Sequence, residues 1–474
     1  MINNTKMKSG WRNFKKTMFS LTHYGVKQTI NSIQEYSKKR RNYNKALCLS
    51  ETPNGIVSLS NCEKIIFPQF SIPLVSIIIP VYNQFTFTYH CLESIKNTIK
   101  DIPYEIIIAD DCSTDLTRDI QKISENINVV RNTTNLRFLK NCNNATKEAR
   151  GTYIVFLNND TVVQPDWLSS LLSIIEKNEK VGLVGSKLIY ANGLLQEAGG
   201  IIWNDASSCN YGKSCDPNNS DFNYVKEVDY ISGCSILIRA SLWQQLGGFD
   251  EYFAPAYFED TDLAFQVREA GYKVVYQPSS VVIHYEGISN GTNVTTGQKK
   301  YQEINKIKFA KKWKEELLKK QLSFGQEEFL ARDRSRNKKR LLVIDQHVPF
   351  IDQDANSKNT FSNLELFAKI GYQVTFWGDD FCPHQPFTFM LQQLGINVLY
   401  GDWYKTNHVK WLKNNSCYFD YVYLNPSSIA IKYIHVIKKC SKAKIFYYGQ
   451  DLSFLPKEEQ KNLDKNLKHL GVFV

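Results

Sequence analysis

Apolar runs alternate with amphipathic segments along the chain from residue 73 onward. Four of these runs are rich in Ile, Val or Phe and predict buried strands, at 74–83, 105–115, 127–132 and 153–157. The segment 141–150 predicts a helix that precedes the last of them. Because strands that alternate with helices are typical of a parallel sheet covered by helices on its faces, the predicted fold class is α/β.

A second alternation of the same kind begins at residue 340. Strands are predicted at 340–349 and 373–378 and in several later runs, with helices between them, which indicates a doubly wound sheet. It has no G-x-G-x-x-G turn, so no dinucleotide site is predicted. Between the two regions, 301–322 predicts a strongly basic helix and 323–339 a linker.

These patterns divide the chain into four parts. They are a basic helical N-terminal extension (1–72), a first α/β domain (73–291), a basic helix with a linker (292–339) and a Rossmann-like half domain (340–474). The basic extension has two interpretations, a solvated helix that packs on its own protein or an amphipathic helix on an anionic membrane surface. The second is the source of an expected peripheral contact with the inner membrane.

Polar side chains cluster where three of the predicted strands end. The clusters are Tyr82 and Asn83, Asp110 and Asp111, and Asn158, Asn159 and Asp160. Any one of them alone could be a simple turn, because Asn and Asp are common turn residues. Ligands of open α/β sheets bind at the carboxyl ends of the strands, so three clusters in one array predict a nucleotide crevice.

Other candidates lie further along the domain. Gly200 and Gly233 stand in predicted strands, where glycine allows the backbone to approach a ligand closely or simply marks a bulge or turn. Glu259 and Asp260 begin a predicted helix, a place where acids ordinarily complement the helix dipole. His284 ends a strand and would ordinarily be structural.

Composition narrows the classes of partner. The net charge of +11 on 474 residues suggests anionic partners, but no zinc-finger, RNP-like or helix-turn-helix signature supports nucleic acid. No apolar run reaches the roughly 20 residues of a membrane span. The eleven cysteines form no C-x-x-C pair, and the start lacks the apolar core of a secretory signal, so a cytoplasmic protein with idle thiols is expected.

Four ordered blocks carry a family resemblance. The runs VSIIIPVYN, IIIADDCSTD, NLRFLKNCNNA and YIVFLNNDT resemble the family 2 inverting glycosyltransferases of GT-A fold, most closely the rhamnosyltransferase-like members that build bacterial surface polysaccharides. The resemblance covers about 74–291 and implies a GT-A nucleotide-diphospho-sugar transferase domain. Residues 340–474 resemble the N-terminal Rossmann half of GT-B glycosyltransferases, and we expect that module to be incomplete because a donor half would need roughly 150 further residues.

The resemblance also implies roles for individual residues. Asp160 matches the last carboxylate of the family's DxD motif, and His284 matches a residue that completes its metal site, which implies Mn²⁺ or Mg²⁺. Asp260 matches the general base of the FEDTDL block, with Glu259 orienting an acceptor hydroxyl. The implied contacts to the donor are Pro80, Tyr82, Asn83, Asp110, Asp111, Asn135, Lys140, Asn158 and Asn159, with Asp111 pairing with a pyrimidine base and Gly200 and Gly233 on the acceptor and diphosphate side.

Two positions depart from the family pattern. Asn158 replaces the first carboxylate of the DxD motif, and Arg137 stands where many members carry glycine. The resemblance nevertheless implies a metal-dependent inverting transferase that moves a hexosyl or deoxyhexosyl group from a nucleoside-diphosphate sugar to a glycan or lipid-linked glycan acceptor. One alternative is a noncatalytic scaffold that binds nucleotide sugars or glycans. The other is a nucleotidyltransferase, which is disfavoured because PVYNQF follows the first strand in place of a Gly-rich basic loop.

Overall fold

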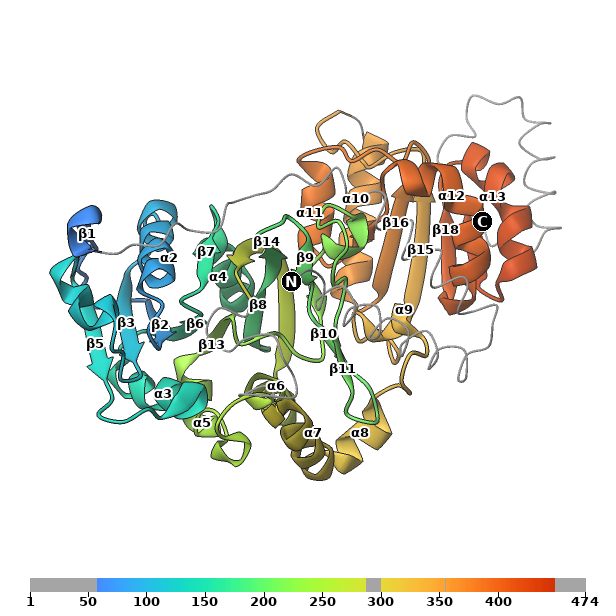
Figure 1. Ribbon diagram of the computed structural model, residues 1–474. Coiled ribbons are helices and arrows are strands. Elements are labelled where there is room, and N and C mark those ends of the chain that lie inside the picture. The colour runs from blue at the N-terminus through green and yellow to red at the C-terminus, as the bar shows by residue number, and fades with distance from the viewer. Residues whose placement is uncertain (1–57, 287–299, 354, 448–474) are drawn as a thin grey trace, which may run out of the picture.

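A computed structural model describes residues 58–286, 300–353 and 355–447 of the chain. The described part is α/β throughout and contains two large sheets that lie side by side (Figure 1), as the sequence predicts. The predicted basic helix in residues 1–47 lies outside the described residues. None of the described helices combines the length and the apolar character needed to cross a membrane.

The first sheet has ten strands. The central path runs in the order β12-β14-β8-β13-β6-β2-β3-β5, with β7 paired to β14 and β9 to β8. The strands are β2 (Val75–Val81), β3 (Tyr104–Asp110), β5 (Ile127–Arg131), β6 (Tyr153–Leu157), β7 (Thr161–Val163), β8 (Val181–Tyr190), β9 (Leu195–Glu197), β12 (Lys226–Glu227), β13 (Ser235–Arg239) and β14 (Lys273–His284). Short two-stranded sheets join β1 (Ile65–Ile66) to β4 (Ser124–Glu125) and β10 (Gly200–Ile202) to β11 (Ser208–Asn210).

The direction of the strands differs from the prediction in one half of this sheet. Strands β6, β2, β3 and β5 are parallel to one another, as expected. Strand β13, however, runs antiparallel to both of its neighbours, β6 and β8, so the sheet is mixed. Hydrophobic periodicity reports how deeply a strand is buried and says nothing of its direction, which is why the pattern could not reveal this reversal.

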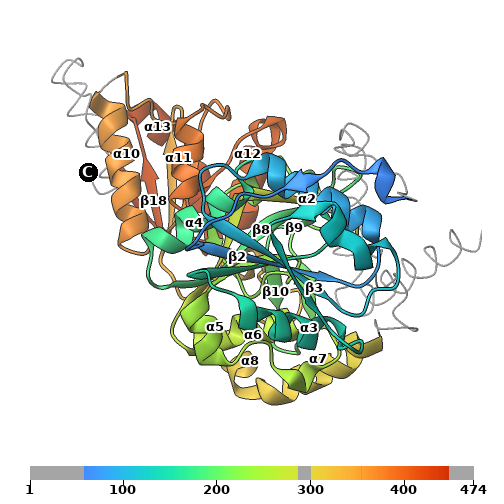
Figure 2. The same cartoon turned by 90° about the vertical axis from the view of Figure 1, so that its left-hand side faces the viewer.

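Helices cover both faces of the first sheet (Figure 2). Helices α2 (Phe85–Thr98) and α4 (Trp167–Lys177) pack on one face, while α3 (Arg137–Ala145), α5 (Ala240–Leu246), α6 (Glu259–Glu269) and α7 (Lys300–Lys312) lie on the other. Within β2, Ile77 and Ile79 join the core on the α2 side and Ile78 joins the opposite core. A strand buried on both faces needs apolar residues at every position, which explains the continuous runs in the sequence.

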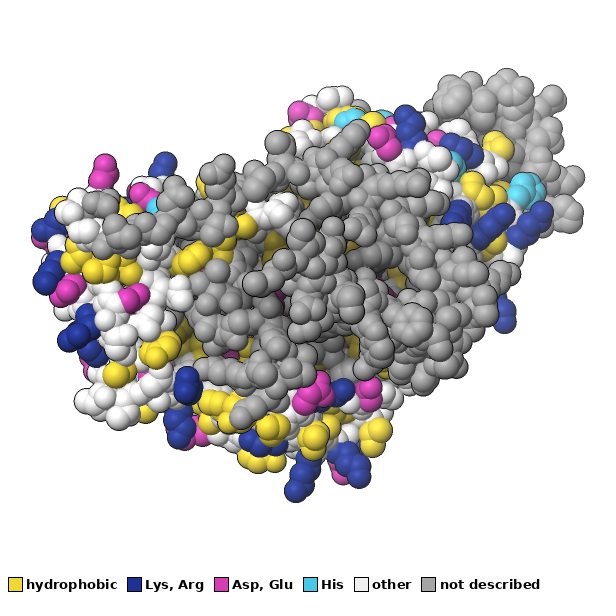
Figure 3. Space-filling view, in the orientation of Figure 1, with side chains coloured by type: hydrophobic (Ala, Val, Ile, Leu, Met, Phe, Trp, Pro, Cys, Tyr) yellow, Lys and Arg dark blue, Asp and Glu magenta, His cyan; other side chains and the backbone are white. Residues whose placement is uncertain are grey.

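The predicted basic helix 301–322 is interrupted. Helix α7 ends at Lys312 and α8 (Lys314–Lys320) follows, because Trp313 leaves the helical conformation with φ −104° and ψ 20°. The Trp313 indole N–H donates to Asp262 Oδ1 at 2.6 Å. Basic side chains project from the outer surface near α7 and α8 among hydrophobic and acidic ones (Figure 3), and Lys319 pairs with Glu315 there at 2.9 Å.

The second sheet is entirely parallel, in the order β17-β16-β15-β18-β19. Its strands are β15 (Arg340–Asp345), β16 (Gln373–Gly378), β17 (Asn397–Val398), β18 (Tyr421–Leu424) and β19 (Lys444–Tyr447). Helices α10 (Ala355–Lys369) and α11 (Phe387–Gln393) cover one face, and α12 (Asp402–Asn415) and α13 (Ser427–Cys440) cover the other. This arrangement is the doubly wound half domain that the sequence predicts.

The segment predicted as a linker is packed between the two sheets. It contains α9 (Glu328–Ala331), and the buried Arg332 beyond it forms an ion pair with Asp221 at 2.9 Å. Asp221 also accepts a hydrogen bond from the Tyr404 hydroxyl group of the second part at 2.7 Å. Polar contacts therefore connect the half domain to the first sheet through this segment.

Lys226 lies in the same contact region and is almost fully buried. Its ammonium group has no hydrogen-bond partner among the described residues, and it sits 4.2 Å from the centre of the Tyr211 ring. Burial, assisted by the nearby Arg332 guanidinium, lowers the pKa of Lys226 to about 7. The charged form is therefore disfavoured in the folded protein.

Lys226→Met is expected to raise the free energy of unfolding at pH 6 by roughly 1–3 kcal/mol. Between pH 7 and the ordinary pKa of lysine, the unfolded chain binds a proton that the folded one has released, so the wild type gains stability as the pH rises. The advantage of the variant should thus shrink from pH 7 to pH 9. Urea unfolding at pH 6, 8 and 9 measures it, with the exposed Lys177→Met as control. A less stable Lys226→Met at pH 6 would show that the tyrosine rings hold the lysine charged.

Candidate active site

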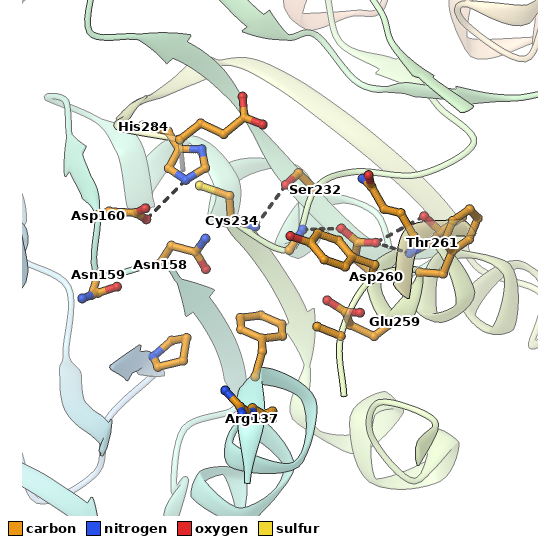
Figure 4. A pocket seen from close by; sticks show the side chains of 18 of the residues that line it. Arg137, Asn158, Asn159, Asp160, Ser232, Cys234, Glu259, Asp260, Thr261 and His284 are labelled. Carbon is orange, nitrogen blue, oxygen red and sulfur yellow. Dashed lines mark hydrogen bonds and ion pairs between the residues drawn. The ribbon is translucent and has the colours of Figure 1, made fainter. Parts of the chain in front are cut away.

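A cavity of about 390 Å³ opens where β2 and β6 end, and it extends to the start of α6 (Figure 4). Its size is ordinary for a small-molecule site. Eleven of the residues singled out in the sequence line it: Pro80, Tyr82, Asp111, Asn135, Asn158, Asn159, Asp160, Gly233, Glu259, Asp260 and His284. Members of all three strand-end clusters and the acidic helix start, which are far apart in the sequence, therefore share one cavity.

Asp160 and His284 meet through the pairing of two strands. Strand β7 begins directly after Asp160 and runs antiparallel to the end of β14, which places Thr161 opposite His284. The backbone N–H of Tyr285 donates to the Asp160 carbonyl oxygen at 3.0 Å and closes the same pairing. As a result His284 Nε2 lies 3.2 Å from Asp160 Oδ1, and both side chains are largely buried (Figure 4).

The His284 ring is held from its other side. Nδ1 donates to Gln196 Oε1 at 3.1 Å, so Nε2 is the nitrogen presented to Asp160. Burial opposes the charged ring, but the Cys234 thiol group and the Asp160 carboxylate favour it, and the net effect raises the pKa of His284 well above its usual value. Without a ligand, Asp160 and His284 thus form an ion pair.

The donor atoms of this pair fit a divalent cation. Two neighbouring ligands of an octahedral ion, each about 2.1 Å from it, lie about 3 Å apart, which matches the separation of Asp160 Oδ1 and His284 Nε2. Within the described ranges, no group of three or more His, Cys, Asp or Glu side chains could hold a metal. Two protein ligands suffice for Mg²⁺ or Mn²⁺ when water and substrate phosphates complete the shell.

The two asparagines before Asp160 contribute differently. The Asn159 side chain donates to Thr88 Oγ1 at 3.0 Å and is thereby anchored against α2. The Asn158 backbone N–H donates to the Cys234 carbonyl at 2.9 Å, which continues the pairing of β6 with β13, and its side chain lines the cavity. With Asn158 at the position of the first carboxylate of the motif, Asp160 is the one acidic side chain among these three residues.

Glu259 and Asp260 are presented by a strained turn. Tyr257 and Phe258 precede them with φ values of 73° and 72°, in the left-handed region that bulky residues rarely adopt. Such strain persists where the surrounding structure enforces it and is common at functional sites. The turn directs the first residues of α6 into the cavity.

The two carboxyl groups differ in their hydrogen bonds. Asp260 Oδ2 accepts from the Gly233 N–H at 2.9 Å, and Oδ1 accepts from the Thr261 N–H at 2.6 Å and from the Thr261 hydroxyl group at 3.2 Å. Glu259 Oε2 has no hydrogen-bond partner among the described residues. Three hydrogen bonds from Gly233 and Thr261 stabilise the ionised form of Asp260, whereas only backbone hydrogen bonds favour a charge on Glu259.

Because of these differences, the carboxyl groups of Glu259 and Asp260 differ in their protonation. Burial raises the pKa of Glu259, and the adjacent Asp260 raises it further. Burial also raises the pKa of Asp260, but its three hydrogen bonds lower it. A neighbouring pair of this kind carries one proton on the less solvated member, so at neutral pH Glu259 is the acid and Asp260 the carboxylate.

Asp111 organises the loop that leads into α3. Its Oδ1 accepts from the Leu136 N–H at 2.7 Å and its Oδ2 from the Arg137 N–H at 2.8 Å. Arg137 has φ 65°, a conformation that glycine adopts without cost. Arg137 thus holds a positive φ at this position and adds a guanidinium group to the cavity lining.

Two predicted donor contacts lie outside this cavity and have structural partners. Asn83 Oδ1 accepts from the Thr114 N–H at 2.7 Å and the Asp115 N–H at 3.3 Å, so it holds the turn after β3. Asp110 is fully buried, and its Oδ2 pairs with Arg131 Nε at 2.6 Å. Both side chains therefore hold the scaffold of the crevice.

Lys140 and Gly200 also lie outside the cavity. The Lys140 ammonium group pairs with the Glu251 carboxylate at 2.9 Å on the surface, in place of a phosphate. Gly200 is required by packing, since a Cβ atom there would lie 2.0 Å from the Tyr230 ring. Gly233 does line the cavity, and a Cβ atom there would make only an ordinary contact of 3.5 Å with Asp260 Cβ.

Some lining residues were not found from the sequence. They include Gln196, Glu197, Tyr230 and Ser232. The available signal was the pair of polar residues, Gln196 and Glu197, in the apolar run that becomes β9. Polar residues in a buried strand need partners, so such a pair is a sign of a site.

Comparisons with known proteins identify a family for part of the chain. Residues 76–246 match the profile of the family described as Glycosyl transferase family 2. The chain is 32% identical over 152 residues to the O-antigen biosynthesis protein RfbC of Myxococcus xanthus, covering 31% of this chain and 12% of that protein. It is 43% identical over 67 residues to an N-acetylglucosaminyl-diphospho-decaprenol L-rhamnosyltransferase of Mycobacterium tuberculosis, covering 14% of this chain and 21% of that protein.

The alignments therefore span well under two thirds of these relatives' own lengths. Among solved structures, the crystal structure of GalNAc-T7 with UDP, GalNAc and Mn²⁺ is similar, with 14% sequence identity and a TM-score of 0.42. That similarity covers 56% of this chain and 55% of the other.

Proposed function

Residues 76–246 belong to the family 2 glycosyltransferases, and from this premise we propose that the protein is a metal-dependent inverting transferase. It would move a hexosyl or deoxyhexosyl group from a nucleoside-diphosphate sugar to a hydroxyl group of a cell-surface glycan acceptor. The observation that carries the proposal is one cavity with the Asp160–His284 pair on one side and the Asp260 carboxylate on the other (Figure 4). The names of the Myxococcus and Mycobacterium relatives support the acceptor class.

The donor side of the cavity is suited to a nucleoside diphosphate. Asp160 and His284 would hold the divalent cation, which would stabilise the charge that develops on the leaving diphosphate. The loop anchored by Asp111 lines the neighbouring wall and brings Arg137 to it, where a guanidinium group can pair with phosphate. The nucleotide would therefore lie between this loop and the Asn158 side chain.

Asp260 is placed to activate the acceptor. Its Oδ2 accepts one hydrogen bond from the protein, from the Gly233 N–H, and retains a further lone pair for an acceptor hydroxyl group. Asp260 would take the proton of that hydroxyl group as its oxygen forms a bond to the anomeric carbon and the bond to the diphosphate breaks. A base works best when its pKa approaches the working pH, and burial shifts the pKa of Asp260 in that direction.

Glu259 would keep its proton during this step. A neutral acid next to the ionised Asp260 avoids a second negative charge and can donate a hydrogen bond to the acceptor. A single displacement on the side of the sugar opposite the diphosphate inverts the anomeric carbon. Inversion therefore follows from having one base and no nucleophilic side chain in the proposed mechanism.

The test of this function is nucleotide binding. The wild-type protein should bind UDP or dTDP in the presence of Mn²⁺, and EDTA should weaken that binding at least about 10-fold, because Asp160 and His284 contribute few charges on their own. Isothermal titration calorimetry with UDP, dTDP and GDP, with and without Mn²⁺, measures it.

Each outcome has a distinct meaning. Equal affinity with Mn²⁺ and EDTA would disprove the metal dependence and leave a nucleotide site. No binding of any pyrimidine diphosphate would remove the donor site altogether. Binding of nucleotide sugars without transfer to any glycan acceptor would favour the noncatalytic scaffold.

A further inference from the structure

Glu197 is a buried acid in the wall of the cavity with one unused oxygen. It ends β9, its side chain is fully buried, and its Oε1 accepts from the Ser232 N–H at 3.0 Å. Its Oε2 has no hydrogen-bond partner among the described residues. Leaving a buried polar atom unpaired is unfavourable, so folding alone gives no reason for this acid.

Burial favours the uncharged form of Glu197. Burial raises the pKa of its carboxyl group to about 8, and the Ser232 N–H offsets only part of that effect. A neutral carboxylic acid has an O–H group that donates a hydrogen bond, and the described part of the chain offers no acceptor to Oε2. The side chain is therefore prepared for an oxygen that arrives with a ligand.

The neighbours of Glu197 locate that ligand. The preceding residue, Gln196, accepts the hydrogen bond from His284 that orients the donor side of the cavity. On the other side, consecutive N–H groups of one turn hold two acids, with Ser232 bound to Glu197 and Gly233 bound to Asp260. Glu197 thus lies between the expected place of the diphosphate and the expected base.

The space between the expected diphosphate and Asp260 must hold the transferred sugar. The anomeric carbon is bonded to the diphosphate and is attacked by the oxygen that Asp260 deprotonates, so the transferred sugar lies between the two. Resting on the proposed function, we propose that Glu197 is a specificity residue whose Oε2 donates a hydrogen bond to a hydroxyl group of the transferred sugar. A site built to bond a hydroxyl group strongly disfavours a sugar that lacks it.

Calorimetry with two kinds of ligand tests the inference. UDP and dTDP report on the nucleotide site, and UDP-glucose, UDP-galactose, UDP-GlcNAc and dTDP-rhamnose add a sugar, all in the presence of Mn²⁺. Glu197→Ala should bind the nucleoside diphosphates as the wild type does but lose at least about 10-fold in affinity for the sugar donor that the wild type binds best.

Two further variants separate recognition from structure. Glu197→Gln keeps an N–H donor at the same place and should retain the wild-type affinity within about 3-fold. The melting temperature of Glu197→Gln should match that of the wild type, since its amide oxygen still accepts from the Ser232 N–H. The exposed Glu176→Ala on α4 is the matched control and should change neither affinity.

Several results would overturn the inference. Equal weakening of UDP and UDP-sugar binding would make Glu197 a support of the donor side only. Unchanged sugar affinity in Glu197→Ala, or a wild type to which the sugar adds no affinity, would show that Glu197 makes no such contact. If the wild type binds none of the nucleotides, the proposed function fails first and the inference falls with it.

Discussion

Asp260→Asn is expected to lower the rate of sugar transfer about 10³-fold, within the range that general bases contribute. The amide has no negative charge to accept the proton of the acceptor hydroxyl group. Its NH₂ group would also face an N–H donor in either orientation, because Gly233 donates to one oxygen of Asp260 and Thr261 to the other. Single-turnover transfer from a bound donor measures the effect.

The design separates chemistry from folding. Asp260→Ala removes the group without the unfavourable N–H contact, and it should lose as much activity as Asp260→Asn. Both should bind UDP with Mn²⁺ as the wild type does, because the Asp160–His284 pair is on the other side of the cavity. The exposed Asp352→Asn is the control for a change of charge. Transfer at the wild-type rate by Asp260→Ala would show that another group is the base.

Asp160→Asn is expected to weaken Mn²⁺-dependent binding of UDP or dTDP about 100-fold, which corresponds to about 2.8 kcal/mol. Asp160 supplies the carboxylate of the predicted metal site, and the amide that replaces it has no charge. Calorimetry in Mn²⁺ and in EDTA separates the metal-dependent part of the affinity from the remainder. In EDTA the variant and the wild type should bind alike.

His284→Ala is a second test of the predicted metal site. It removes the other donor atom and should also weaken Mn²⁺-dependent binding, while Gln196 loses its partner. Thermal unfolding of both variants checks that the β7–β14 pairing survives. If Asp160→Asn fully retained the Mn²⁺-dependent affinity, the metal would have to bind elsewhere in the cavity.

The strands of the fold were predictable because burial leaves a direct mark on composition. Strand β6 coincides with the predicted run 153–157, and β16 coincides with 373–378. Both strands lie inside a sheet with helices on both faces, so nearly every position must be apolar. The break in the basic helix was not predictable, since it depends on Trp313 bonding to Asp262 on another helix.

The sequence predicted which types of side chain form the candidate site better than it predicted which individual residues line it. The acids and amides at strand ends were visible, and most of them line one cavity. Asn83 and Asp110 have the same chemistry but hold the scaffold, and no local pattern distinguishes them from Asp111. Which neighbour a polar group bonds is decided by segments far away in the sequence.

The sequence by itself determined the order of strands and helices and the positions at which polar residues interrupt the apolar runs. These properties depend on residues that are neighbours along the chain. The tertiary structure alone decided that β7 pairs with β14 and so joins Asp160 to His284. It also decided which buried acids receive hydrogen bonds, as Asp260 does, and which keep an unpaired oxygen, as Glu197 does. Hydrogen-bond partners and burial come from distant segments, and these set the protonation that the proposed chemistry needs.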